Sequence, residues 1–131
     1  MIREFILGDQ KGIAELEREC FSSPWSENAV LESYEADTSF FVFLENEKIL
    51  GYAGLQIVLD EGYVTNIAVT KEARGRGIGK ALIETLVNFS KEKSLTVLRQ
   101  GLYSVFIDLV SASPFRWQAV RKRARPRYTQ A

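Results

Sequence analysis

A glycine-rich loop flanked by cations is the segment of this sequence best suited to chemistry. It reads Arg74-Gly75-Arg76-Gly77-Ile78-Gly79-Lys80, after a β-branched run at 64–70 and before a segment of helical apolar period. The N–H groups at a helix start lack intrahelical acceptors and lie at the positive end of the helix dipole, so they bind anions. The sequence therefore predicts a pyrophosphate site at residues 74–80, to which Arg74, Arg76 and Lys80 add positive charge.

The spacing of the glycines excludes two common phosphate loops. A Walker loop requires Gly, four residues and then Gly-Lys-Ser/Thr, but Arg74 replaces the first glycine and Ala81 replaces the hydroxyl residue. The dinucleotide fingerprint requires glycines at relative positions one, three and six. Counted from either candidate glycine, the sixth position is Lys80 or Leu82. Both of these nucleotide-binding classes are therefore excluded.

The loop does fit the pattern Arg/Gln-x-x-Gly-x-Gly/Ala, with Arg74, Gly77 and Gly79 at the defined positions. Together with the strand before it and the helix after it, this pattern resembles that of the GNAT family of acetyl-CoA-dependent N-acetyltransferases. The resemblance implies that residues 74–80 hold the pyrophosphate of acetyl-CoA, which would serve as the acetyl donor.

The strand before the loop has an implied role of its own. Ile67, Ala68 and Val69 have the composition of a buried strand, so any function would lie in their backbone. The peptide-like pantetheine arm can pair with a strand edge as an added strand would. In the resembling family this strand splays from the next one to admit the arm, and one of its N–H groups faces the thioester carbonyl. Such a donor stabilises the oxyanion that develops in acyl transfer.

A second segment, Cys20-Phe21-Ser22-Ser23-Pro24-Trp25-Ser26, resembles an element of the bacterial ribosomal-protein N-terminal alanine acetyltransferases. The resemblance covers residues 1–98. It implies direct transfer of the acetyl group to a protein N-terminal amine, with the alanine of a small-subunit ribosomal protein as the expected acceptor. Trp25 would either anchor its loop in the core or line the substrate entrance, and Cys20 is expected to be a small core residue.

The catalytic residues cannot be assigned from the sequence, because the chain departs from the family from about Thr96 onward. By position the family's catalytic Glu falls near Gly101 and its Tyr near Ser113, and neither residue matches. We therefore expect impaired activity, with Glu61 as a reserve proton acceptor acting through water. A disrupted reading frame is our hypothesis for the atypical segment 99–131.

Composition restricts the class of protein. A chain of 131 residues suits one domain, and a single cysteine excludes an internal disulfide. The absence of histidine removes the commonest base and metal ligand, so zinc enzymes and Ser-His or Cys-His hydrolases are excluded and no metal is expected. No apolar run reaches the ~18 residues of a membrane span, which predicts a cytoplasmic protein without a membrane partner.

Charge is distributed unevenly along the chain. Residues 1–98 hold ten Lys and Arg against sixteen Asp and Glu, whereas residues 99–131 hold seven against one. The formal net charge of zero thus results from −6 balanced by +6. The basic run at 121–127 is expected to be a solvated end of the chain, and contact with nucleic acid is the sharper alternative.

The apolar periods predict a single domain, 1–131, of α/β (α+β) class. Expected strands lie at 2–6, 39–44, 49–58 and 62–69, and the middle two form a hairpin. Expected helices begin after an Asp9 cap, after a Ser26 cap and at the glycine-rich loop, where Ile78, Leu82, Leu86 and Phe89 form an apolar stripe. This order resembles the GNAT fold, a mixed and mostly antiparallel sheet flanked by helices on both faces.

Three alternatives remain open at this point. The chain could be a non-catalytic acyl-CoA-binding module, because the cofactor half is intact while the catalytic half is unrecognisable. It could be a GNAT-like scaffold for a basic nucleic-acid-binding tail, which steeply salt-dependent RNA binding would support. As an enzyme it could be a monomer, or a homodimer in which the altered C-terminal third pairs strands with a second copy.

Overall fold

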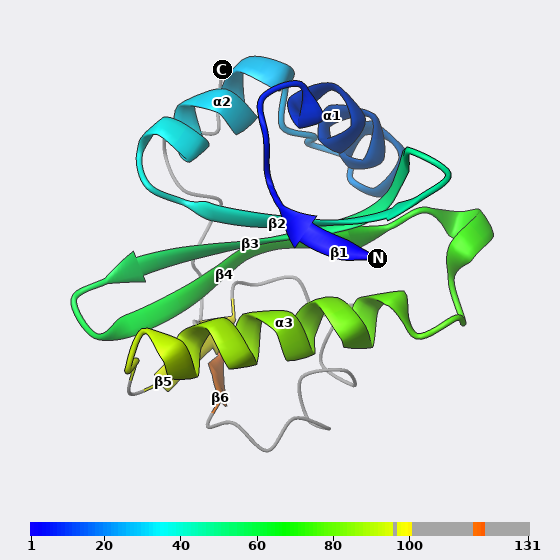
Figure 1. Cartoon of the computed structure of the whole chain (residues 1–131). Helices are drawn as coiled ribbons and strands as arrows, with labels where there is room; N and C mark the ends of the chain where they lie inside the picture. Colours follow the sequence, from blue (N-terminus) through cyan, green and yellow to red (C-terminus); the bar gives the residue numbers. More distant parts are fainter. Residues whose placement is uncertain (96, 101–116, 120–131) are drawn as a thin grey trace.

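A computed structural model describes residues 1–95, 97–100 and 117–119 of the chain (Figure 1). The strands in this part are β1 (Ile2–Glu4), β2 (Ser39–Glu45), β3 (Lys48–Val58), β4 (Glu61–Val69), β5 (Val97–Gln100) and β6 (Trp117–Ala119). The helices are α1 (Asp9–Cys20), α2 (Glu27–Glu35) and α3 (Ile78–Glu92), with the 3-10 helix η1 (Lys71–Ala73) before α3. The expected order of elements is confirmed, although the first strand is shorter than predicted.

The strands form one mixed sheet. Its order is β1-β2-β3-β4-β5-β6. The pairs from β1 to β4 are antiparallel, whereas β5 runs parallel to β4 and β6 runs parallel to β5. The mostly antiparallel sheet expected from the sequence is therefore confirmed.

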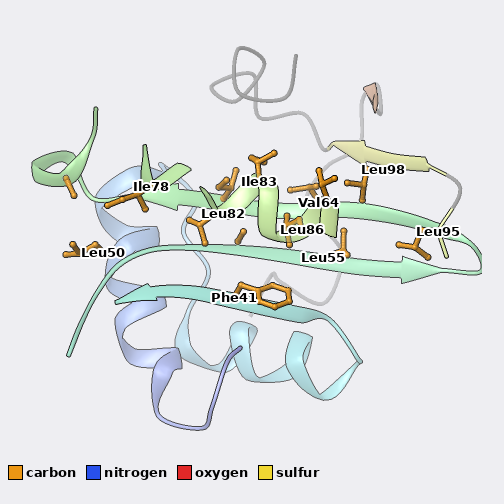
Figure 2. Packing of buried hydrophobic residues seen from close by; sticks show 14 residues of the cluster. Phe41, Leu50, Leu55, Val64, Ile78, Leu82, Ile83, Leu86, Leu95 and Leu98 are labelled. Atoms are coloured by element: carbon orange, nitrogen blue, oxygen red, sulfur yellow. The ribbon is translucent and has the colours of Figure 1, made fainter. Parts of the chain in front are cut away.

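Helices cover both faces of this sheet (Figure 1). The helices α1 and α2 lie on one face, and α3 lies on the other. On the α3 face, Ile78, Leu82 and Leu86 point toward the strands and pack with residues such as Leu55 and Val64 (Figure 2). This contact is what the apolar stripe predicted from the sequence requires, and it fixes the start of α3 beside the end of β4.

The face covered by α1 and α2 has its own hydrophobic cluster. Ile13 and Leu16 of α1 and Ala29 and Val30 of α2 pack there against the aromatic rings of the sheet. Trp25, in the loop between the two helices, is only 1% exposed and lies edge-on to Phe40. Of the two roles considered for Trp25, the core anchor is therefore confirmed.

The predicted cap of helix α2 is present in the structure, whereas the predicted cap of α1 is not. Ser26 caps α2 as predicted, because its hydroxyl accepts the N–H of Ala29 at 3.1 Å. The prediction that Asp9 caps α1 was wrong: Gly8 occupies the cap position and Asp9 is the first helical residue. The Asp9 carboxylate instead accepts the N–H of Ile6 at 2.9 Å and a bond from Arg3 at 2.8 Å. Two groups that precede the helix, the Arg3 side chain of β1 and the Ile6 N–H, thus hold the carboxylate in place of the first-turn N–H groups of α1.

A β-bulge interrupts the pairing of β3 with β4. Gly54 pairs with Asn66 and Leu55 pairs with Val64, so Thr65 is an extra residue on β4. β5 pairs only with the first part of β4, Glu61–Val64. Among the described residues, β4 therefore has no neighbour on its β5 side from Thr65 onward, just before the glycine-rich loop.

Several expectations concern residues outside the part that the structure describes. These are the positions near Gly101 and Ser113, the basic run at 121–127 and most of the atypical segment 99–131. Within the described residues, no helix combines the length and apolar character needed to cross a membrane.

Candidate functional site

The glycine-rich loop turns sharply between η1 and α3. Gly75 and Gly77 both have a φ of +83°, a conformation that residues with a side chain rarely adopt. A Cβ atom built on either glycine would meet no heavy atom within 4 Å. The backbone thus borders open space at both positions, which leaves room for a bound group to approach the chain closely.

The start of α3 has the free donors that an anion site needs. Gly77 is the cap residue and makes no side-chain cap bond, and the first turn contains no acidic residue. The first-turn N–H groups of Ile78, Gly79 and Lys80 have no intrahelical acceptor. Lys80 is exposed and has no ion-pair partner among the described residues. The Lys80 ammonium lies at the positive end of the helix dipole, which is unfavourable by itself. A bound anion would interact favourably with both the ammonium and the helix end.

The two arginines of the loop already have partners in the protein. Arg76 forms an ion pair with Glu45 at the end of β2, in which Nη1 donates to Oε1 at 3.2 Å. The hydrogen bond from Arg76 holds the pKa of Glu45 below its usual range and raises the pKa of Arg76. Both side chains are nearly half exposed, at 47% and 45%. The pair is therefore accessible to solvent, and a phosphate oxygen could replace the carboxylate.

Arg74 points back toward the end of β4. Its Nε donates to the carbonyl oxygen of Val69 at 3.0 Å, and its Nη2 lies 3.5 Å from Sγ of Cys20. Cys20 is half-buried at the end of α1, packs against the α1–α2 cluster, and has a pKa raised mainly by burial. These contacts make Arg74 a link between loop, strand and helix in this structure.

Glu19 holds the beginning of the loop to α1. Its carboxylate accepts the N–H of Lys71 at 2.7 Å and the hydroxyl of Thr70 at 2.9 Å. The bond from the Lys71 N–H is the main cause of a lowered pKa for Glu19. This carboxylate therefore fixes the point where the chain leaves β4 for the loop.

The strand residues expected to border the pantetheine arm lie directly before the loop. Ile67, Ala68 and Val69 pair on one side with Ala53, Tyr52 and Gly51 of β3. On the other side, no described residue of β5 reaches them. The side chains of Ile67 and Ala68 are buried on opposite faces of the sheet, in the two hydrophobic clusters. The structure thus brings residues 67–69 and 74–80 together at one edge of β4.

A buried carboxylate that sequence reasoning missed lies beneath this strand. Glu17 of α1 is fully buried and accepts the N–H of Trp25 at 2.9 Å, a bond from Nδ2 of Asn66 at 3.0 Å, and a bond from the Tyr52 hydroxyl. It therefore joins α1, the loop before α2, β3 and β4. The sequence does indicate that this carboxylate is buried, because Glu17 lies four residues after Ile13 and so falls on the apolar stripe of α1.

Glu61, the reserve proton acceptor, lies at the far end of β4. It accepts the Tyr63 hydroxyl at 3.0 Å. Asn66 lies five positions further along the strand, a span of about 17 Å. Direct contact between Glu61 and a group bound beside residues 67–69 is therefore incompatible with this geometry.

A cleft of about 760 Å³ opens elsewhere, between the start of α1 and the β2–β3 turn. Arg3, Gly12 and Lys48 are among its lining residues, and none of residues 67–69 or 74–80 lines it. No unpartnered buried polar side-chain atom of the described residues lies in its lining. We therefore assign it no function.

A helix start packed beside the partly unpaired end of β4 is the arrangement expected of a GNAT acetyltransferase domain. The chain belongs to this family, because the sequence model of the acetyltransferase (GNAT) family matches its residues 11–105. Its sequence is 32% identical over 117 residues to a Bacillus subtilis protein provisionally named a ribosomal protein bS18-alanine N-acetyltransferase. That alignment covers 80% of this chain and 78% of the relative.

Other relatives are matched over a smaller share of their length. The bS18-alanine N-acetyltransferase of Haemophilus influenzae is 32% identical over 90 residues, which make up 69% of this chain but only 62% of that enzyme. Among solved structures, the ribosomal-protein-S18-alanine N-acetyltransferase of Escherichia coli superposes with a TM-score of 0.76 at 25% identity. The superposition covers 86% of this chain and 74% of the Escherichia coli chain.

Proposed function

We propose that this chain transfers an acetyl group from acetyl-CoA to the N-terminal amine of a protein. One observation carries the proposal: the open, uncapped start of α3 adjoins the end of β4 that has no β5 partner among the described residues. The first feature suits a pyrophosphate, and the second suits a peptide-like arm that ends in a thioester.

The loop and the end of β4 would bind different parts of acetyl-CoA. The N–H groups at the start of α3 and the side chain of Lys80 would hold the pyrophosphate, and Arg76 would join them on leaving Glu45. The backbone of residues 67–69 would pair with the pantetheine arm. One N–H of this strand would then stabilise the negative charge that develops on the thioester oxygen.

Transfer would be direct. The neutral amine attacks the thioester carbonyl, an N–C bond forms, the C–S bond breaks, and the proton lost by nitrogen balances the one gained by the CoA sulfur. An N-terminal amine has an ordinary pKa of about 8, so a sizeable neutral fraction exists near neutral pH. Holding this amine against the thioester supplies much of the acceleration, which is why the missing family Glu and Tyr are compatible with reduced rather than absent activity.

The acceptor is proposed from the names of the relatives. Several are named for the alanine of ribosomal protein bS18. We therefore propose a protein substrate that begins with alanine, and a small-subunit ribosomal protein as its source.

Mass spectrometry of a short alanine-starting peptide incubated with the purified chain and acetyl-CoA tests this proposal. We expect one acetyl group on the peptide N-terminus, and no acetylation of a matched peptide whose N-terminus is blocked but which contains lysine. Binding of acetyl-CoA without any acetylated peptide would contradict the proposal and indicate a non-catalytic binding module.

A further inference from the structure

Two buried oxygens on β4 have no hydrogen-bond partner among the described residues. They are Oγ1 of Thr65 and Oδ1 of Asn66, whose residues are 5% and 1% exposed. Buried polar atoms are nearly always paired, because an unpaired one loses its bond to water without compensation. Two such atoms on neighbouring residues therefore call for a physical explanation.

The β-bulge brings both side chains to the same face of the sheet. An ideal Cβ on Gly54 would lie 2.6 Å from Oγ1 of Thr65 and 2.7 Å from the ring of Phe40, which belongs to the α1–α2 cluster. Asn66 bonds to Glu17 of α1, on that same face. Without the extra residue, neighbouring side chains of a strand would point to opposite faces.

Glu17 fixes which way the Asn66 amide points. A carboxylate only accepts hydrogen bonds, so the NH₂ group of Asn66 faces Glu17 and the carbonyl oxygen Oδ1 is directed away from it. Glu17 is itself held by the N–H of Trp25 and the hydroxyl of Tyr52. The orientation of Oδ1 is thus set by a network of buried bonds.

Along β4, these two oxygens also lie next to the expected position of the thioester. They immediately precede residues 67–69, and the β5 pairing ends at Val64. An acyl arm that enters from the glycine-rich loop and follows residues 69 to 67 would bring its thioester end toward Asn66. The acceptor amine must meet the thioester at that end.

We propose that Oγ1 of Thr65 and Oδ1 of Asn66 accept the two N–H bonds of the neutral acceptor amine. This inference rests on the proposed function and names how its second substrate is held. A neutral primary amine has one lone pair, which must face the thioester carbon, and two N–H groups, which need acceptors in a buried site. Two uncharged oxygens supply these acceptors without the preference for ammonium that a carboxylate would have.

Peptide binding to the CoA-saturated chain tests this inference without depending on turnover. The probes are a peptide that begins with alanine and the same peptide beginning with N-methylalanine, which has one N–H fewer when neutral. We expect the wild type to bind the alanine peptide about tenfold more tightly, as expected for one lost hydrogen bond in a buried site. In Thr65→Val and in Asn66→Ala, the alanine peptide should bind several-fold more weakly and the ratio between the two peptides should fall toward one.

Thr65→Val keeps a β-branched residue of the same size in the strand, so its fold should persist, which thermal unfolding checks. Thr85→Val is the matched control, because Thr85 lies on α3 and its hydroxyl bonds to Ala81 of the same helix. Wild-type affinities and an unchanged peptide ratio in Thr65→Val and Asn66→Ala would overturn the inference, as would a wild type that binds neither peptide. If the peptide effects hold but acetyl-CoA yields no acetylated product, the proposed function fails while this subsite stands.

Discussion

Arg76 of the glycine-rich loop is ion-paired with Glu45 at the end of β2. A cation placed beside the proposed pyrophosphate site is thus bound to a carboxylate of the protein. A pyrophosphate bound at the proposed site would compete with Glu45 for the same guanidinium, so the pair would weaken the binding of acetyl-CoA.

Removing the carboxylate should therefore strengthen the binding of acetyl-CoA. We expect Glu45→Gln to lower the Kd about two- to threefold, a small effect because the pair is exposed. Glu47→Gln is the control: it removes the same charge two residues further along the chain, and Glu47 is not the ion-pair partner of Arg76. Calorimetric titrations compare the two variants. Equal affinities in both would show that the ion pair does not compete with the ligand.

Gly77 should be required for binding rather than for folding. Asparagine tolerates positive φ, so Gly77→Asn should fold, but its side chain would occupy the open space at the start of α3. We expect the Kd for acetyl-CoA to rise at least tenfold. Gly8→Asn provides a matched control, since Gly8 precedes α1 with a φ of +110° and also has no neighbour within 4 Å of a built Cβ. If Gly77→Asn binds as the wild type does, the anion is held elsewhere.

Glu17 should contribute strongly to stability. Glu17→Ala leaves the donors of Trp25, Tyr52 and Asn66 without this buried acceptor, so the free energy of unfolding should fall by about 3 kcal/mol. Urea denaturation measures the change. Glu15→Ala, an exposed position of the same helix, should change it by less than about 0.5 kcal/mol. A similar small effect for Glu17→Ala would contradict the structural role given to this carboxylate.

Glu19 should make stability depend on pH in the acid range. Its pKa is lowered in the folded protein, chiefly by the N–H of Lys71, so its contribution is fully present above the unfolded pKa of about 4.3. This contribution is lost as the pH falls through the lower folded pKa. We expect Glu19→Gln to melt a few degrees below the wild type at pH 7, since Glu19 is exposed, and the gap to close in acid.

Melting curves of the wild type, Glu19→Gln and Glu15→Gln over this pH range check the prediction. Glu15→Gln should follow the wild type throughout, because the exposed Glu15 side chain has no hydrogen bond or ion pair among the described residues. If the difference in melting temperature between the wild type and Glu19→Gln widened as the pH fell, the pKa of Glu19 would not be lowered by folding.

Local periodicity was sufficient to predict most of the fold. The apolar stripe of α3 and the hairpin turn at Asn46 and Glu47, both with positive φ, depend on residues close in sequence. Residues 67–69 and 74–80 could be proposed as a site because each range is a continuous stretch of the sequence. The partners of these elements could not be found in this way.

The interactions that sequence reasoning missed each join two different elements of the fold. The Asp9 carboxylate bonds to Arg3 across the turn from β1, Glu17 reaches Asn66, and Arg76 reaches Glu45. A carboxylate in a sequence pattern has several partners available to it, and only the packed fold selects one. The bulge at Thr65 is likewise a property of strand register, which no local pattern specifies.

A pair of calorimetric titrations tests whether residues 74–80 hold the pyrophosphate of acetyl-CoA. One uses acetyl-CoA and the other uses acetyl-pantetheine, which carries the same thioester but no pyrophosphate. We predict measurable binding of acetyl-CoA and binding of acetyl-pantetheine weaker by at least about a hundredfold, since several charge-assisted hydrogen bonds are lost. No binding of acetyl-CoA, or equal affinity for the two compounds, would contradict a pyrophosphate site at residues 74–80.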